Sequence, residues 1–315
     1  MSAVDPTSAD VTPTELAALA ALAELEYDVV DVFTPTPFAG NALAVVYGAH
    51  DLPTSALQSL AREFNLSETV FATPTPHDAD TDYRVRIFTP LTELPFAGHP
   101  SVGAAWALAR RGLVAGPALV QGCAAGLVPV QLGQGAGEVT WVGGTDPRVA
   151  HEIEPDGPLA ATGLVAEDLV GLPTLVAGAG LDFGYLVVRP GAVAKAMPDL
   201  RLLRSLRSQS ARLAGVSVVG WHDGTARVRV FTDDIGAAED PATGSAALGL
   251  AVVLVAHGLL AGDGTSTFTV RQGVEMGRPS TLHGEVTAAG GRAVACRVGG
   301  EVVPIASGTV RVPPG

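Results

Sequence analysis

The chain contains a near-identical hexapeptide twice, as Arg84-Val85-Arg86-Ile87-Phe88-Thr89 and, about 143 residues later, as Arg227-Val228-Arg229-Val230-Phe231-Thr232. Both copies are rich in β-branched and aromatic residues, which favour a strand. Each copy is followed by a loop and then by a helix start made of small residues, at 98–105 and at 240–247. The same order at nearly one offset indicates a duplication whose period is too long for a solenoid, where units are about 20–50 residues. The repeat therefore predicts two homologous domains related by a pseudo-two-fold axis, with a cleft between them.

The sequence around the repeat predicts the bounds of the two domains and several of their helices and strands. Residues 1–26 are expected to form a helical or disordered appendage, 27–145 a first domain and 146–315 a second, with the C-terminal strands able to cross back to the first. Residues 27–145 and 180–285 should superpose. A helix is expected to begin near Thr54, and strands are predicted at 27–33, 42–47, 69–73, 83–89 and 138–142.

Composition excludes several classes of function. The net charge of −13 argues against a nucleic-acid partner, which would need Lys and Arg against its phosphates. The longest strongly apolar run, 248–256, is far shorter than the roughly 20 residues of a membrane-spanning helix. The acidic N-terminus is not a signal peptide. Cys123 and Cys296 cannot build a disulfide framework or a metal cluster and are expected to pack as small buried residues. We therefore expect a cytoplasmic protein without a membrane partner.

Both helix starts carry a residue that can act as an acid or base. His99 precedes Pro100, and proline is favoured as the first residue of a helix; Asp240 precedes Pro241 in the same way. Free N–H groups and the positive end of the helix dipole make such a start a site for an anion. A small carboxylate metabolite is therefore expected to bind between His99 and Asp240, near Gly98, Pro100, Ser101, Thr243, Gly244, Ser245 and Ala246.

Glu68 is a third candidate, because it stands where a helix meets a hydrophobic strand. A carboxylate beside apolar residues loses solvation, which raises its pKa towards the range that is useful in proton transfer. Structural explanations exist for all three residues. Asp240 could be a helix cap, His99 a hydrogen-bonded core histidine, and Glu68 an exposed loop residue.

No motif for a nucleotide or a metal is present. No glycine-rich phosphate loop follows a predicted strand, and the turn at 262–266 lacks the lysine of such a loop. The seven histidines show no metal-ligand spacing. We therefore expect neither a cofactor nor a metal.

Five blocks, running in order from Tyr27 almost to the end, resemble the PhzF family of phenazine-biosynthesis-like isomerases, whose fold looks like that of diaminopimelate epimerase. These blocks are Asp31-Val32-Phe33-Thr34 with Phe38-Ala39-Gly40-Asn41-Ala42-Leu43-Ala44-Val45, Asn65-Leu66-Ser67-Glu68-Thr69, Glu93-Leu94-Pro95-Phe96-Ala97-Gly98-His99-Pro100, Glu239-Asp240-Pro241-Ala242-Thr243-Gly244-Ser245-Ala246, and Gln272-Gly273 with Gly277-Arg278-Pro279-Ser280.

The resemblance implies an α+β fold in which two duplicated domains each wrap a strongly curved sheet, or half-barrel, around a central helix. It implies that Glu68 shuttles a proton with His99 and Asp240 as partners, and that Ser67, Gly98 and Ser245 contact the ligand. The epimerase relatives place cysteines at the two helix starts. This chain has none there, which argues against racemisation by two thiols. The resemblance is also compatible with a homodimer.

The leading hypothesis is thus a cofactor-independent isomerase or epimerase that moves a proton on a small carboxylate, with Glu68 as base and then acid. Two alternatives stay open. One is a catalytically silent anion-binding protein of the same fold. The other is a hydrolase with a triad of Ser245, His99 and Asp240, although no Gly-x-Ser-x-Gly pattern surrounds Ser245.

Overall fold

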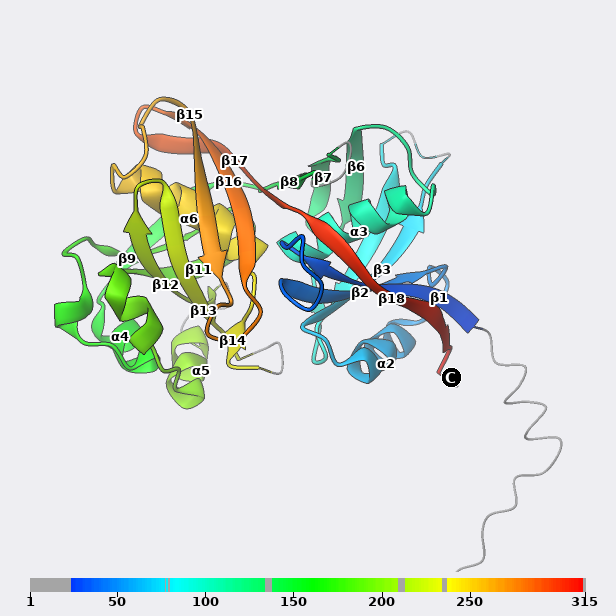
Figure 1. The fold of residues 1–315 in the computed structure, drawn as a ribbon, viewed down its shortest axis with the longest axis horizontal. Helices are drawn as coiled ribbons and strands as arrows, with labels where there is room; N and C mark the ends of the chain where they lie inside the picture. The colour runs from blue at the N-terminus through cyan, green and yellow to red at the C-terminus, as the bar shows by residue number, and fades with distance from the viewer. Residues whose placement is uncertain are drawn as a thin grey trace, which may run out of the picture.

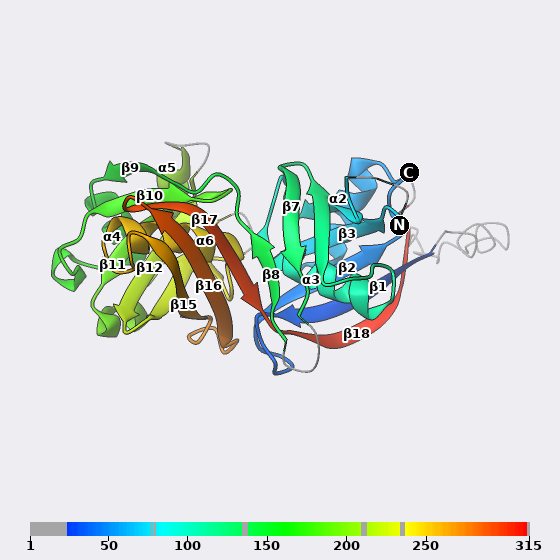
Figure 2. The ribbon, with the colours of Figure 1, turned by 90° about the horizontal axis from the view of Figure 1, so that it is seen from above.

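A computed structural model of the chain describes residues 24–76, 78, 80–133, 138–208, 213–233 and 237–313. The fold is α+β and forms two lobes side by side (Figures 1 and 2). The first lobe contains most of the N-terminal half together with the C-terminal strand: β1 (Glu24–Val32), β2 (Asn41–Tyr47), α2 (Thr54–Phe64), β3 (Glu68–Pro74), β4 (Tyr83–Phe88), β5 (Glu93–Leu94), α3 (Gly98–Arg110), β6 (Ala118–Cys123), β7 (Gly126–Gln131), β8 (Thr140–Gly143) and β18 (Val302–Arg311).

The second lobe contains the remaining elements. They are β9 (Arg148–Ile153), α4 (Asp156–Thr162), the 3₁₀ helix η1 (Ala166–Asp168), β10 (Thr174–Gly178), β11 (Asp182–Val188), the 3₁₀ helix η2 (Pro190–Lys195), α5 (Leu200–Ser208), β12 (Leu213–His222), β13 (Thr225–Phe231), β14 (Glu239–Asp240), α6 (Gly244–Ala256), β15 (Gly264–Gln272), β16 (Ser280–Ala289) and β17 (Arg292–Gly300).

The strands of the two lobes pair in the same pattern. In the first lobe β2 and β3 are parallel, β3 and β4 antiparallel, β4 and β6 parallel, and β6 and β7 antiparallel. In the second lobe β11 and β12, β12 and β13, β13 and β15, and β15 and β16 repeat these four directions. The two hexapeptides lie in β4 and β13, and β8 pairs with β17 to join the lobes. The C-terminal strand β18 pairs with β1.

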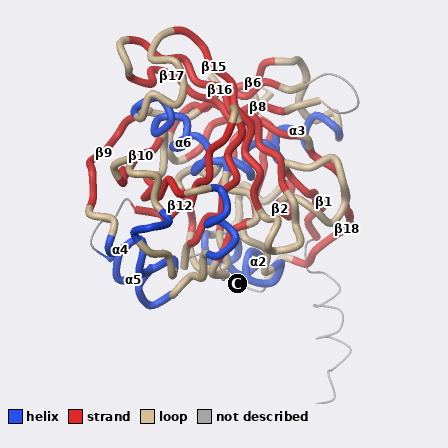
Figure 3. The backbone as a smooth tube through the Cα atoms, turned by 60° about the vertical axis from the view of Figure 1, so that its left-hand side comes forward, coloured by secondary structure: helices blue, strands red, loops and turns tan. Residues whose placement is uncertain are grey.

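Each lobe surrounds one helix with strands. Helix α3 contacts β1, β2, β3, β7 and β8, whereas α6 contacts β9, β10, β11, β16 and β17. Because strands pack around α6, it is apolar on all sides and buried from Gly244 to Val255. Helices α2, α4 and α5 lie on the outside of the lobes (Figures 1 and 3). Within the described ranges, no helix has the length and apolar character that crossing a bilayer requires.

The start of β1 differs from the prediction. Residues 24–26, which were expected to end the N-terminal appendage, form the beginning of β1 and pair with β18. Leu25 is buried there against the cluster beneath α2, which explains why the strand starts earlier than the pattern at Tyr27 indicates. The predicted helix or tail at 1–23 lies outside the described residues.

Candidate active site

The two central helices meet at their N-termini. A Cβ atom built on Gly98 would lie 2.9 Å from the Cα atom of Gly244, and one built on Gly244 would lie 3.0 Å from the Cα atom of Gly98. Only glycine permits this approach. The side chains of the N-cap residues Ala97 and Thr243 do not accept hydrogen bonds from the first-turn N–H groups of α3 and α6. These N–H groups are therefore not capped by the side chains that usually satisfy them. The predicted meeting of the helix starts is confirmed, and it brings two positive dipole ends together.

The register of the two starts differs from the prediction. The glycine contact aligns Glu93-Leu94-Pro95-Phe96-Ala97-Gly98 with Glu239-Asp240-Pro241-Ala242-Thr243-Gly244. His99 is thus the second residue of α3 and Pro100 the third. Asp240 lies in β14 before the N-cap, so it does not cap α6. Our matching of His99 with Asp240 was wrong, because His99 lies inside α3 whereas Asp240 lies before the N-cap of α6.

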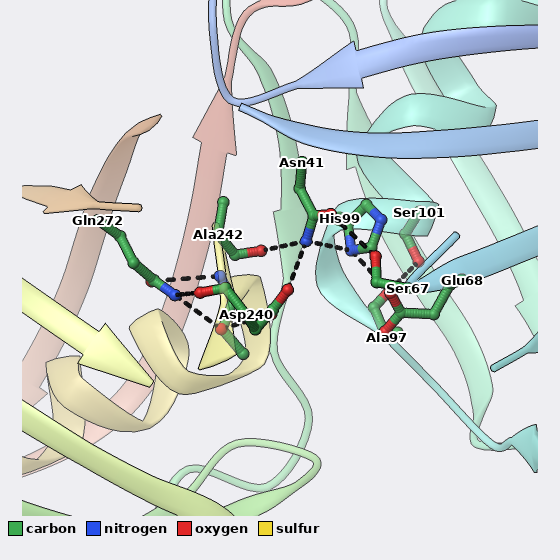
Figure 4. Close-up of polar contacts among 10 residues, drawn as sticks. Asn41, Ser67, Glu68, Ala97, His99, Ser101, Asp240, Ala242 and Gln272 are labelled. Atoms are coloured by element: carbon green, nitrogen blue, oxygen red, sulfur yellow. Dashed lines mark hydrogen bonds and ion pairs between the residues drawn. The ribbon is translucent and has the colours of Figure 1, made fainter. Parts of the chain in front are cut away.

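Asn41 lies between the two lobes and links the candidate residues (Figure 4). Its Nδ2 donates to Asp240 Oδ1 at 2.8 Å and to the Ala242 carbonyl at 2.9 Å, and it lies 3.4 Å from His99 Nδ1. Its Oδ1 accepts from Ser67 Oγ at 2.9 Å. With 1% of its surface exposed, Asn41 is a fixed part of the interior.

Asp240 is fixed from the side of the second lobe. Thr243 Oγ1 donates to Asp240 Oδ2 at 2.6 Å, and Gln272 Nε2 donates to the Asp240 carbonyl at 2.8 Å and to Thr243 Oγ1 at 2.9 Å. The Thr243 N–H in turn donates to Gln272 Oε1 at 3.2 Å. Each of these side chains is therefore held by at least two bonds, and the Asp240 carboxylate has one orientation.

Glu68 and His99 face one another in the first lobe. Asn65 ends α2 in the left-handed conformation, at φ 50°, and the chain then enters β3, which begins at Glu68. Glu68 Oε2 lies 3.5 Å from His99 Nδ1, and the two residues are 7% and 3% exposed. The structure thus excludes the alternative of an exposed loop residue for Glu68.

The imidazole of His99 is neutral in the folded protein. Burial lowers the pKa of His99 to about 3, although a backbone hydrogen bond at Ala42 acts in the opposite direction. His99 therefore brings no positive charge to Glu68 at neutral pH. It can donate or accept one hydrogen bond at Nδ1, depending on its tautomer.

The other predicted ligand-binding residues lie in the first turns of the two helices, but not all have a free side chain. Ser101 Oγ donates to the Ala97 carbonyl and accepts from Gln121, so it faces its own lobe. Ala246 accepts Tyr185 Oη at its carbonyl. The first-turn positions also include His99, Pro100, Gly244 and Ser245, all buried.

A cavity of about 300 Å³ adjoins this cluster between the lobes. Asn41 and Ser67 border it from the first lobe, whereas Pro241 and Arg278 border it from the second. The remaining lining residues are Ala42, Asn65, Leu66, Ala237, Glu239 and Met276. Neither Glu68 nor His99 is among the lining residues, so the cavity borders the cluster at Asn41 and Ser67 without enclosing it.

Two residues of the cluster were missing from the predicted site. Asn41 and Gln272 both lie within the blocks quoted above as resembling the PhzF family, and an amide at a strand end was the available signal. In the part of the chain that the structure describes, no group of three or more His, Cys, Asp or Glu side chains could hold a metal ion. Burial raises the pKa of Cys296 to about 12, so this thiol stays protonated.

The α+β fold brings Glu68, His99 and Asp240 to two meeting helix starts, and comparisons with known proteins show the class to which this chain belongs. The chain belongs to the PhzC-PhzF family of phenazine biosynthesis-like proteins, whose model matches residues 30–308. It is 36% identical over 296 residues to an uncharacterized isomerase of Mesorhizobium japonicum, covering 90% of this chain and 97% of the relative. It is 34% identical over 285 residues to the trans-2,3-dihydro-3-hydroxyanthranilate isomerase of Pseudomonas aeruginosa, covering 90% and 98%. The chain is an isomerase of this family.

Solved structures agree on the fold. A PhzF-family phenazine biosynthesis protein of Bacillus anthracis is similar with a TM-score of 0.81 at 23% identity, over 92% of this chain and 99% of that chain. A hydroxyproline epimerase of Agrobacterium vitis, with bound trans-4-OH-L-proline, is similar with a TM-score of 0.64 at 17% identity, over 92% and 93%. The fold is therefore shared with proteins that bind small carboxylates.

Proposed function

We propose that this isomerase moves a proton between two carbons of a small carboxylate metabolite without a cofactor, and that Glu68 carries the proton. The observation that supports this most is the pairing of the buried Glu68 carboxyl with neutral His99, 3.5 Å away, where two uncapped helix starts meet. A general acid or base must lie near its substrate, and a developing anion must have donors. This arrangement can supply both.

The reaction follows from these roles. Glu68 as carboxylate takes a proton from a carbon conjugated to the substrate carboxylate, and the electron pair moves into that conjugated system. First-turn N–H groups of α3 and α6 stabilise the added charge. Protonated Glu68 then returns its proton to another carbon on the same face. In the tautomer that carries its hydrogen on Nδ1, His99 can donate to ionised Glu68 and orient its carboxylate.

One base fits the two lobes better than two bases do. We propose that the lobes are two copies of one half-barrel domain, divided near residue 145. The strand pairs Thr69–Phe88 and Val216–Phe231 then correspond, which places Gly215 where the first lobe has Glu68. The second lobe has no side chain at this position. This asymmetry supports a proton shift on one face over an epimerisation with bases on both faces.

The substrate is proposed by class. The Pseudomonas relative acts, by its name, on trans-2,3-dihydro-3-hydroxyanthranilate, and the helix starts here favour an anion. We infer an unsaturated carboxylate small enough for a cavity of about 300 Å³.

The two alternatives have less support. A triad would need Asp240 to orient His99, but the Asp240 carboxylate accepts bonds from Asn41 and Thr243, while His99 faces Glu68. A silent binding protein would need only the helix starts and would have no use for a buried Glu68.

Turnover in deuterium oxide tests the proposal, with trans-2,3-dihydro-3-hydroxyanthranilate as the first substrate and a series of unsaturated carboxylates after it. A proton shift forms the isomer and places deuterium at the accepting carbon at least partially, to the extent that the proton on Glu68 exchanges with water before it is returned. A silent binding protein incorporates no label into any of them, and a hydrolase releases an alcohol or amine instead.

A further inference from the structure

The first lobe has a second cavity on its outer face, which the proposed reaction does not use. We call it the α2 cavity. Its volume is about 400 Å³, and it lies between α2 and the strands β3, β4 and β6. Its walls include the apolar side chains of Ala49, Leu57 and Phe71, together with Thr73 and Arg86.

Arg86 has an exact counterpart in the second lobe in sequence and in geometry. Arg86 Nε and Nη2 donate to the two carboxylate oxygens of Glu93 at 2.8 and 2.7 Å. Arg229 donates to Glu239 through the same two atoms at 2.8 and 2.6 Å. Both arginines are the third residue of the repeated hexapeptide. The same bidentate Arg–Glu ion pair is therefore present in both lobes.

The two arginines differ at the third nitrogen. Arg229 Nη1 donates to the carbonyl of Ala196 at 2.6 Å, and only 8% of its side chain is exposed. The side chain of Arg86 is 37% exposed. Among the residues that the structure describes, no acceptor lies within hydrogen-bond distance of Arg86 Nη1. The described residues of the first lobe thus provide no counterpart of the Ala196 carbonyl at this nitrogen.

The chain itself supplies this acceptor in the second lobe. The link from β11 to α5 is longer than the link from β2 to α2, and it contains η2, which packs on β12 and β13. A Cβ atom on Gly220 would lie only 2.8 Å from Val193 of η2. The strand pairs Thr73–Arg84 and Gly220–Arg227 correspond, so Thr73 occupies the position of Gly220. The α2 cavity is therefore the space that η2 and Ala196 fill in the other lobe.

We propose that the α2 cavity is a second binding site, which takes the backbone of a short aliphatic peptide. An amide carbonyl of the peptide accepts from Arg86 Nη1, and a small apolar side chain packs over Thr73 and Phe71. A neutral acceptor suits the site because Glu93 already neutralises Arg86, and Asp78 accepts from the neighbouring Arg84 at 2.8 Å. The apolar walls provide the remaining contact.

A titration followed by amide chemical shifts tests this site on the whole chain. The probe is the blocked heptapeptide with the sequence of residues 190–196, Pro-Gly-Ala-Val-Ala-Lys-Ala. It should shift the amide signals of Phe71 and Gly122, which line the cavity, with an affinity in the millimolar range. The proposal would be overturned if the signals of Phe71 and Gly122 do not shift at the highest soluble concentration of the peptide. It would also be overturned if only signals from the cleft between the lobes shift.

Three variants locate the contact. Arg86→Lys keeps a positive charge beside Glu93 but removes the guanidinium group and with it the Nη1 donor. It should weaken peptide binding about tenfold. Arg84→Lys is the same substitution on the neighbouring cavity residue and should change binding less than about twofold. Equal weakening by both would mean that charge alone holds the peptide, which contradicts the carbonyl contact. Thr73→Phe fills the cavity and should abolish binding; retained binding in this variant would also contradict the proposal.

Discussion

Asn41 Nδ2 donates a hydrogen bond of 2.8 Å to Asp240 Oδ1, although the two residues are 199 positions apart and lie in different lobes. The same nitrogen also donates to the Ala242 carbonyl at 2.9 Å. An amide nitrogen has two hydrogens, so both are used in contacts with the second lobe. His99 Nδ1 lies farther from this nitrogen, at 3.4 Å, and 3.5 Å from Glu68 Oε2, so Asn41 connects the second lobe to the Glu68–His99 pair.

Substitution of Asn41 by Asp should be strongly destabilising. The variant keeps the shape but replaces a donor with a carboxylate beside the Asp240 carboxylate, in a position that is 1% exposed. Leaving a buried charge uncompensated costs about 3–5 kcal/mol. Asn41→Ala removes the same bonds without adding charge and should cost about 1–3 kcal/mol. The free energy of unfolding in urea measures both effects. An Asp variant that is no less stable than the Ala variant would show that the fold does not require a hydrogen-bond donor at residue 41 beside Asp240.

The neutral state of His99 predicts how stability depends on pH. Because the pKa of His99 is about 3 in the folded protein and about 6.5 in the unfolded chain, the unfolded chain binds a proton that the folded protein excludes. This term is absent above the unfolded pKa and reduces stability as the pH falls towards the folded pKa. It should amount to about 2 kcal/mol at about pH 5.

The variant His99→Gln isolates this term, since glutamine does not titrate. The wild type should lose about 2 kcal/mol more than His99→Gln between about pH 8 and about pH 5. The free energy of unfolding at the two pH values gives this difference directly. Equal losses in the two proteins would mean that His99 accepts a proton readily in the folded state.

The contact between the helix starts predicts the effect of a single methyl group. Gly98→Ala would place a Cβ atom 2.9 Å from the Cα atom of Gly244, so the helices must move apart. Such overpacking costs about 1–3 kcal/mol, and it should also weaken the increase in melting temperature caused by a small carboxylate. Gly191→Ala is the control, because a Cβ atom there meets nothing within 4 Å. If a small carboxylate raises the melting temperature of Gly98→Ala as much as that of the wild type, the helix starts do not form the anion site.

The meeting of the helix starts was predictable because both starts are glycine-containing, small-residue segments that follow a copy of the hexapeptide. It did not give the register. Pro95 and Pro100 are equally good matches to Pro241 by local rules, and only the packing of Gly98 on Gly244 selects one of them. Local preference cannot report a contact between residues so distant in the chain.

Asn41 and Gln272 were missed for a related physical reason. Neither side chain has a local partner that would indicate a role: Asn41 bonds Ser67, 26 positions away, and Gln272 bonds Asp240, 32 positions away. Glu68 and His99 were found because each can act as an acid or base and stands beside a predicted helix end. Amides become recognisable only when the fold shows what they join.

The most direct measurement of the central claim is single-turnover labelling in deuterium oxide by wild type, Glu68→Gln and Glu63→Gln. Glu63 is exposed on α2, five positions before Glu68, so the same substitution there should leave turnover unchanged. Glu68→Gln should fold and bind the carboxylate but lose turnover by about 10²–10⁴-fold, with no label at the accepting carbon. Wild-type turnover and labelling in Glu68→Gln would contradict the assignment of Glu68 as the group that carries the proton.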